Sequence, residues 1–195
     1  MKTKQKMNLP NRLTLLRICL IPFIVIIPLI NGLDEVVFGD VKLSNLIVLI
    51  IFCIASFTDF LDGYIARKHN LITDFGKFMD PLADKLLVFA AFILLIEEGL
   101  IPGWIVTVII AREFMVTGIR VLAANNNVVI AASKMGKAKT ISQMLTIIIL
   151  LLSNYPFSLI NIPVDKIMMY LAAFLTVVSG FDYFIKNKNV ILNSK

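Results

Sequence analysis

Charged residues are scarce in this chain of 195 residues, because Asp, Glu, Lys and Arg together make up only 16% of it. An ordinary soluble domain carries about a quarter charged residues and about half apolar ones. Here the apolar share rises to 58%. This composition excludes a disordered chain and a coiled coil. It indicates an integral membrane protein.

Cysteine and histidine are also rare, with two of the first and one of the second. Cys19 and Cys53 each sit inside an apolar run, so they are interpreted as small hydrophobic residues and not as a disulfide or metal pair. His69 lies in a polar loop, and one histidine alone makes no metal site. A disulfide-stapled scaffold is therefore excluded.

Six stretches are long and apolar enough, or nearly so, to cross a bilayer, which takes about 20 residues. The sequence predicts an all-α integral membrane protein with six transmembrane helices in a single membrane-embedded domain over residues 1–195. Residues 1–11 are expected to form a short interfacial segment ahead of a retained first helix. The expected spans are 13–31, 44–66, 80–98, 102–123, 138–154 and 164–185.

The net charge of +6 comes from 19 basic and 13 acidic residues. With the N-terminus in the cytoplasm, only Lys42 and Lys166 of the 19 lie outside. This asymmetry follows the positive-inside rule and predicts a protein of the cell membrane with both termini on the cytoplasmic side. The basic excess is thus explained by topology, and no nucleic-acid partner is expected.

Four aspartates interrupt the apolar pattern at the cytoplasmic ends of the second and third expected spans. Asp59 and Asp62 are three residues apart, and Asp80 and Asp84 are four apart, so each pair shares one helix face. Carboxylates inside a membrane are costly and are functional by default. The spacing therefore predicts two carboxylate pairs on neighbouring helices, and Pro81 fits the first turn of the third helix.

Four carboxylates in one pocket of low dielectric repel one another unless cations compensate them. Hard divalent ions with oxygen ligands fit best, so we expect two metal ions, Mg²⁺ or Mn²⁺, that bind a diphosphate. Gly63 and Ala66 leave room for a phosphate near the backbone, and Arg67 can bind its oxygens through two hydrogen bonds. A single aspartate at a span end is more often a cap, but the whole set follows the pattern D-x2-D-G-x2-A-R-x8-G-x3-D-x3-D.

This pattern resembles the signature of the CDP-alcohol phosphatidyltransferase family and matches it completely. The resemblance implies that the four aspartates bind a two-metal centre and that Asp84 also serves as the base. It further implies six transmembrane helices and a homodimer. The residues expected to bind the CDP group are Asp62, Gly63, Ala66 and Arg67.

Three further segments resemble bacterial members of that family that use glycerol 3-phosphate as the acceptor. They are PNRLTLLR (10–17), AREFMVTGIRVLAA (111–124) and VIAASKMGKAKTISQ (129–143). The implied reaction transfers the phosphatidyl group from CDP-diacylglycerol to sn-glycerol 3-phosphate, with phosphatidylglycerophosphate and CMP as products. The lipid donor is then expected to stay in the bilayer, in contact with other membrane lipids.

Basic residues on the fourth and fifth expected spans support an anionic acceptor. Arg112 lies near mid-bilayer, where an arginine almost always faces a partner or a wet cavity, and Arg120 follows about 80° round the helix. Lys137 and Lys139 stand at the entry to the fifth span. We expect these four to bind the acceptor phosphate. The alternatives are that the lysines anchor the protein in the membrane or bind anionic headgroups, and that Arg112 forms a structural pair with Glu113 or an aspartate.

Two other interpretations stay open at this stage. The same chemistry could use inositol phosphate, serine or phosphatidylglycerol as the acceptor. A divalent-cation transporter could also carry carboxylates inside the membrane, although all four aspartates lie on one side and no repeated halves are visible. Asn11, Thr14 and Arg17 are expected to cap or order the first helix, and a role near the lipid diphosphate is the weaker alternative.

Overall fold

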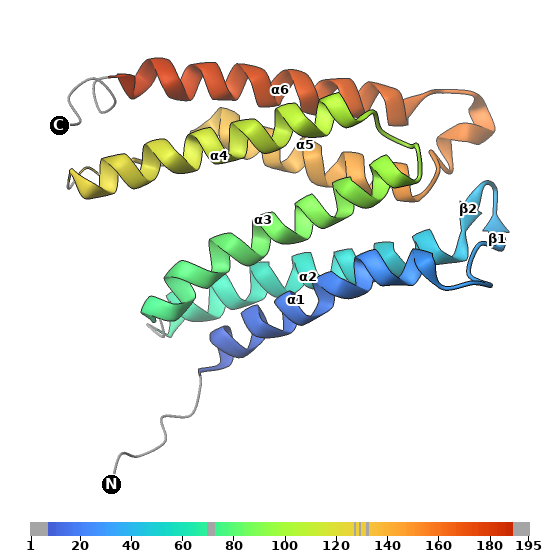
Figure 1. Ribbon diagram of the computed structural model, residues 1–195, viewed down its shortest axis with the longest axis horizontal. Coiled ribbons are helices and arrows are strands. Elements are labelled where there is room, and N and C mark those ends of the chain that lie inside the picture. The colour runs from blue at the N-terminus through green and yellow to red at the C-terminus, as the bar shows by residue number, and fades with distance from the viewer. Residues whose placement is uncertain (1–7, 70–72, 127, 129, 132, 189–195) are drawn as a thin grey trace, which may run out of the picture. The chain divides into compact units, whose positions relative to one another are not determined.

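The computed structural model describes residues 8–69, 73–126, 128, 130–131 and 133–188 of the chain. This part divides into two compact units, Met1–Leu94 and Leu95–Lys195. Helices dominate both units (Figure 1). The α-helices in the described residues are α1 (Leu9–Ile26), α2 (Leu43–Lys68), α3 (Asp74–Glu97), α4 (Gly103–Asn125), α5 (Lys134–Leu151) and α6 (Val164–Lys186).

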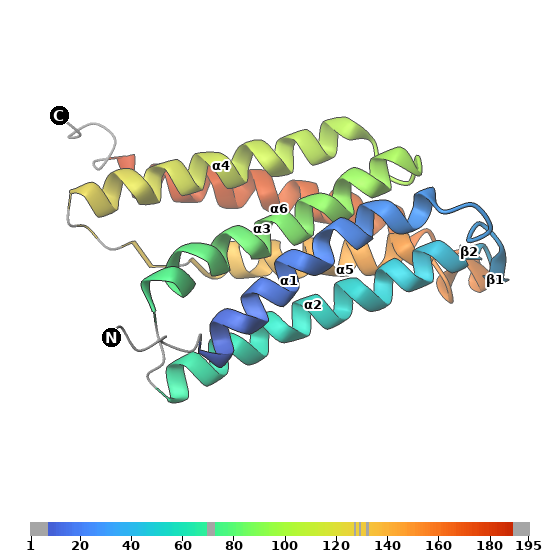
Figure 2. The same ribbon diagram turned by 60° about the horizontal axis from the view of Figure 1, so that its bottom comes forward.

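In the first unit, α1 and α2 run side by side in both ribbon views (Figures 1 and 2). Helix α1 starts after Asn8 with a proline in its first turn, where the missing N–H costs nothing. It therefore begins at Leu9, four residues before the expected span, and residues 9–11 of the expected interfacial segment are helical. Residues 1–7 of that segment lie outside the described part. A short 3₁₀-helix, η1 (Ile27–Leu29), extends α1.

A small hairpin connects η1 to α2, and sequence analysis did not predict it. Its strands are β1 (Val36–Phe38) and β2 (Val41–Lys42), paired antiparallel. Gly39 sits in the tight turn with φ of 55°, a conformation that glycine adopts without steric cost. The hairpin falls in the loop that the charge count assigns to the outer side.

Helix α3 begins earlier than expected, because Thr73 caps it. The Thr73 hydroxyl accepts a hydrogen bond from the Gly76 amide at 3.0 Å, which satisfies one of the unpaired donors at the helix start. The helix begins at Asp74, so Pro81 lies inside it, and the placement of Pro81 in a first turn was wrong. Proline there removes one helical hydrogen bond.

In the second unit, α6 packs along α5 and also against α4. Ser133 caps α5 through a hydrogen bond of 3.0 Å from the Gly136 amide to its hydroxyl. Apolar side chains from all three helices are buried in this unit. They include Ile105 and Ile109 of α4, Ile147 and Leu151 of α5, and Met169 and Ala172 of α6.

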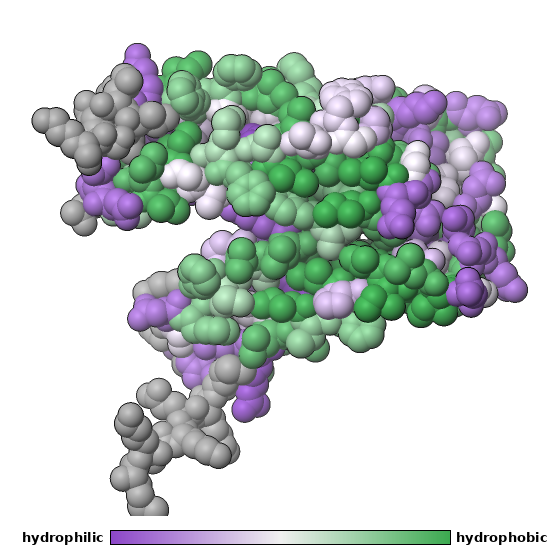
Figure 3. Space-filling view, viewed as in Figure 1, coloured by the Kyte–Doolittle hydropathy of each residue, from purple (hydrophilic) through white to green (hydrophobic). Residues whose placement is uncertain are grey.

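Three described segments are long and apolar enough to cross a membrane, namely Leu9–Leu29, Leu43–Ala66 and Val164–Lys186. The face visible in Figure 3 is apolar along the middle of each unit and polar toward its ends. Large side chains such as Phe57, Phe60 and Phe174 are exposed, as expected for surfaces that contact lipid. The chain is therefore a helical, multi-pass membrane protein.

Candidate active site

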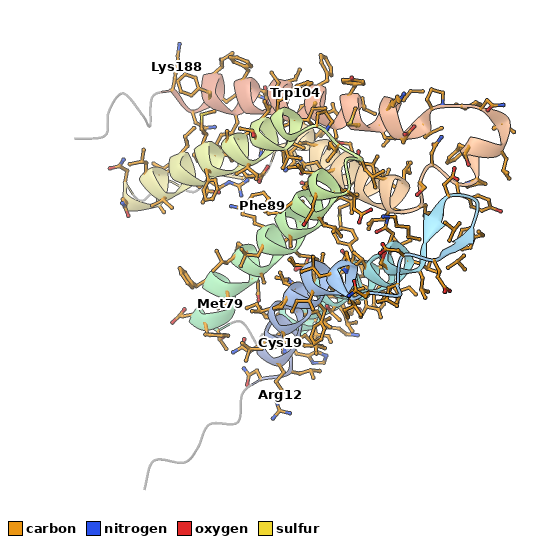
Figure 4. The ribbon with its side chains drawn as sticks, turned by 45° about the vertical axis from the view of Figure 1, so that its right-hand side comes forward. Arg12, Cys19, Met79, Phe89, Trp104 and Lys188 are labelled. Atoms are coloured by element: carbon orange, nitrogen blue, oxygen red, sulfur yellow. The ribbon has the colours of Figure 1, made fainter. Side chains whose placement is uncertain are left out.

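Helix α1 buries a polar face within an apolar helix. Asn11, Thr14 and Arg17 are all buried and recur at intervals of three residues, so they lie along one side of α1. Arg12, in contrast, is exposed and points outward (Figure 4). A buried arginine on a membrane helix needs a partner, because lipid provides no solvation for its charge.

The partners of Arg17 are the two aspartates of α2. One terminal nitrogen of its guanidinium lies 2.7 Å from Oδ1 of Asp59, and the other lies 2.6 Å from Oδ2 of Asp62. Arg17 is fully buried and Asp62 is 3% exposed, whereas Asp59 is 43% exposed. The planar guanidinium can bridge two carboxylates in this way, which an ammonium group cannot do.

Helix α3 meets the same polar face of α1. The Thr14 hydroxyl donates to Oδ1 of Asp80 at 2.5 Å, and the Thr73 hydroxyl donates to Oδ1 of Asn11 at 2.9 Å. Gly76 makes this approach possible, because a Cβ there would lie 3.2 Å from Oδ1 of Asn11. Three of the four predicted aspartates thus contact α1.

The remaining predicted residues of this unit lie nearby in sequence. Asp84 follows Asp80 by one turn of α3 and is half-buried. Gly63 and Ala66 are half-buried on α2, after Asp62. Arg67 belongs to the last turn of α2, but its side chain lies outside the described part of the structure.

The acidic residues match a hard divalent ion in the type of ligand they offer, because Mg²⁺ and Mn²⁺ prefer carboxylate oxygens. Asp62 also lies within electrostatic reach of both Asp59 and Asp80. Across the described residues, however, no three acidic, histidine or cysteine side chains converge into a ligand set.

The second unit holds a buried cluster of opposite character. Arg112 of α4 and Lys139 of α5 are 8% and 4% exposed, and both donate to the same oxygen, Oε1 of Glu113. The Arg112 contact measures 3.1 Å. Two buried cations thus share one carboxylate oxygen. The Nε atom of Arg112 is buried without a hydrogen-bond partner in the described residues.

Gly180 lets α6 approach Arg112. A Cβ on Gly180 would lie 3.1 Å from Cγ of Arg112. The aliphatic stem of Arg112 therefore fills the space that this glycine leaves. This packing fixes the position of the cation.

The other two predicted phosphate ligands lie elsewhere in this unit. Arg120 donates from Nε to the Tyr183 hydroxyl at 3.2 Å, and its guanidinium carbon lies 5.6 Å from the centre of the Tyr183 ring. Lys137 is exposed in the first turn of α5. The structure thus brings Arg112 and Lys139 together, while Arg120 and Lys137 occupy separate environments.

Sequence analysis missed the partnership between α1 and the aspartates. It interpreted Asn11, Thr14 and Arg17 as residues that cap or order the first helix. The available signal was their spacing, because three polar residues on one face of an apolar span require partners in the protein. Glu113 was noticed only as a neighbour of Arg112, yet it contacts Lys139 as well.

A helical protein with several membrane spans, an acidic face opposite a buried arginine, and a separate buried cationic cluster belongs to the class of membrane proteins with polar sites inside the bilayer. Comparison with known sequences makes this specific. The family profile for CDP-alcohol phosphatidyltransferases matches residues 7–178. The chain belongs to the CDP-alcohol phosphatidyltransferase family, as its aspartate pattern indicates.

Several relatives cover almost the whole chain. The CDP-diacylglycerol–glycerol-3-phosphate 3-phosphatidyltransferase of Bacillus subtilis is 50% identical over 190 residues, which is 96% of this chain and 98% of the relative. The enzyme of the same name from Rickettsia bellii is 41% identical over 91% of this chain and 93% of its own length. The one from Haemophilus influenzae is 37% identical over 97% and 98%.

Proposed function

We propose that this protein transfers the phosphatidyl group of CDP-diacylglycerol to sn-glycerol 3-phosphate, releasing CMP and forming phosphatidylglycerophosphate. The observation that carries the proposal is the complete aspartate signature on α2 and α3, in a chain that is 50% identical to an enzyme named for this reaction. The buried cationic cluster of α4 and α5 supports an acceptor that carries a phosphate.

The donor site is proposed on α2 and α3. Asp59, Asp62, Asp80 and Asp84 would hold two divalent ions, Mg²⁺ or Mn²⁺, and these ions would supply positive charge that polarises the diphosphate. Small residues after Asp62 leave room for the nucleotide close to the helix backbone. The proposed CDP-binding residues are Asp62, Gly63, Ala66 and Arg67.

The chemical step needs a base, and Asp84 is proposed for it. Its carboxylate accepts the proton of the acceptor hydroxyl as that oxygen attacks the phosphorus bearing the lipid. A new phosphorus–oxygen bond forms, the bond to the CMP phosphate breaks, and the electron pair leaves with CMP. Proton, phosphatidyl group and leaving group are thereby all accounted for.

The acceptor phosphate is proposed to bind to Arg112 and Lys139, with Arg120 and Lys137 as further contacts. Burial supports the first two, since two buried cations beside one carboxylate favour the binding of an anion. Within the described residues, the buried Nε donor of Arg112 also has no hydrogen-bond partner. Arginine can bind phosphate oxygens through two parallel hydrogen bonds.

The remaining features of the proposal concern the membrane. Six spans and cytoplasmic termini are proposed from the apolar stretches and from the distribution of lysine and arginine. Trp104 is exposed in the first turn of α4 (Figure 4). Tryptophan is common at membrane–water interfaces.

A single domain is supported by the family match, which continues through both units. A homodimer is proposed as well, and native mass spectrometry of the purified protein would test it.

The decisive experiment measures CMP release from CDP-diacylglycerol by the purified protein with Mg²⁺. Glycerol 3-phosphate, inositol phosphate, serine and phosphatidylglycerol are offered separately as acceptors. Wild type is compared with Asp84→Asn and with Asp34→Asn, a matched control whose carboxylate is 67% exposed beside the hairpin. We expect CMP release with glycerol 3-phosphate alone, its loss in Asp84→Asn, and normal activity in Asp34→Asn.

Other results would revise the proposal in distinct ways. Activity with another acceptor alone would keep the donor chemistry and overturn the assignment of the cationic cluster. Full activity of Asp84→Asn would remove the proposed base. No CMP with any acceptor would overturn the enzyme function and favour the transport of divalent cations.

A further inference from the structure

The contacts between α1 and the aspartates share one geometric feature. Each contact engages a single oxygen of a carboxylate: Oδ1 of Asp59, Oδ2 of Asp62 and Oδ1 of Asp80. A carboxylate has two oxygens, and the opposite oxygen of each group takes no part in these contacts. Two side chains of α1, Arg17 and Thr14, make all three of them.

We propose that Thr14 and Arg17 are positioning residues that orient the carboxylates of Asp59, Asp62 and Asp80 so that their opposite oxygens bind the divalent ions. This inference rests on the ligand set of the proposed function. Helix α1 would then contribute to metal binding through these two side chains, although the proposed ligands all lie on α2 and α3. Side chains that hydrogen-bond to the ligands of a metal, without binding the metal themselves, commonly set the affinity of the site.

The burial of the two residues supports a positioning role. Thr14 and Arg17 are both fully buried, so each is held in place by packing and cannot swing into solvent. The Thr14 hydroxyl also lies 3.2 Å from the Pro10 carbonyl oxygen, one turn back along α1. A residue that served only to solvate the aspartates would not need this degree of fixation.

Charge compensation gives Arg17 a second effect on the same site. Asp59 and Asp62 repel each other, and the guanidinium between α1 and α2 offsets that repulsion. Asp59 and Asp62 are thereby held beside one guanidinium without a divalent ion. The carboxylates are then arranged in advance, so less ordering remains when the ions bind.

The test measures binding of Mn²⁺ alone to the full-length protein in detergent, by the loss of the free-ion signal in electron paramagnetic resonance. Thr14→Val removes the hydroxyl and keeps the shape, whereas Thr14→Ser keeps the hydroxyl. Thr107→Val is the matched control, because the Thr107 hydroxyl bonds to the Gly103 carbonyl of its own helix, α4. Melting curves in EDTA verify that each variant is folded.

We expect Thr14→Val to weaken Mn²⁺ binding by about 10- to 100-fold. Thr14→Ser should stay within about threefold of wild type, and Thr107→Val should equal it. Arg17→Lys keeps the charge but cannot bridge both carboxylates, so it should also weaken binding. If Thr14→Val does not fold, the Mn²⁺ affinity of Arg17→Lys alone tests the positioning role.

Wild-type affinity in Thr14→Val or in Arg17→Lys would overturn the positioning role. The proposed function fails separately, through the absence of CMP release, and a protein without transferase activity could still show the expected order of Mn²⁺ affinities. A wild-type protein that binds no Mn²⁺ would overturn both the ligand set and this inference.

Discussion

Lys139 on α5 and Arg112 on α4 reach the same carboxylate oxygen of Glu113, so one anion holds two cations in the interior of the second unit. The two helices are thereby joined by charge at a position where apolar packing would be the simpler solution. Buried ion pairs of this kind seldom add stability over an apolar core, but breaking one leaves an uncompensated charge. We propose a bound anion as the functional reason for keeping two cations there.

Glu113→Gln should lower the free energy of unfolding by about 3 kcal/mol, because Arg112 and Lys139 then repel each other inside the protein. The substitution keeps the size of the side chain, so packing is little changed. Denaturation of the purified protein in detergent would measure the loss. Lys186→Gln breaks the exposed pair with Asp182 and serves as the control, with a cost of at most about 0.5 kcal/mol. Equal stability of the two variants would contradict a buried charge cluster.

Gly180→Ala should displace Arg112, because the new Cβ would lie 3.1 Å from Cγ of the arginine. We expect a stability loss of about 1 kcal/mol and a KM for glycerol 3-phosphate that rises several-fold. The control is Gly118→Ala on α4, where a Cβ meets nothing within 4 Å. That change should be neutral or stabilise by about 0.5 kcal/mol, since alanine favours helices over glycine. An unchanged KM in Gly180→Ala would separate Arg112 from acceptor binding.

Gly76→Ala should separate α1 from α3. Its Cβ would lie 3.2 Å from Oδ1 of Asn11 and 3.3 Å from the Thr73 hydroxyl, which are themselves hydrogen-bonded to each other. We expect the rate of CMP release to fall by at least about tenfold, because Asp80 on the same helix loses its alignment with Thr14. Steady-state assays with saturating substrates would show this. Normal kcat in a folded Gly76→Ala protein would show that the close approach is dispensable.

Removal of divalent ions should abolish activity without unfolding the protein. Chelation with EDTA is expected to stop CMP release, and either Mg²⁺ or Mn²⁺ should restore it. The melting temperature should fall only slightly, because Arg17 compensates Asp59 and Asp62 when no divalent ion is bound. Activity that survives exhaustive chelation would contradict the metal dependence. Unfolding upon chelation would contradict the compensation by Arg17.

Local features of the sequence predict much of this fold. An α-helix occupies most of each of the six expected stretches in the described residues, and helices α2 and α3 carry the aspartate pairs at the predicted spacing. Helix starts were less accurate, since α1, α3 and α5 begin before the expected spans. The first turns of these helices are polar, so they lie outside the apolar runs from which the spans were predicted. In α3, the Thr73 cap starts the helix at Asp74, ahead of its apolar run.

Contacts between helices were harder to predict than the helices. The sequence places Arg17 in an apolar span but does not show which residues on later helices lie opposite it. Arg120 illustrates the same difficulty, because its partner Tyr183 is 63 residues away. Helical periodicity gives the face of a side chain, whereas the facing residue depends on the packing of a second helix.

The burial of Arg17 has a consequence for how the chain is made. On its own, α1 is an apolar segment with a full positive charge in its middle, and Asp62, which neutralises that charge, comes 45 residues later. Lipid cannot solvate an isolated guanidinium, so α1 would be a poor transmembrane segment until the ribosome has delivered α2. Membrane insertion of this protein is therefore expected to proceed with the first two helices as a pair, and the same ion pairs that shape the site would decide when the chain can leave the translocation machinery.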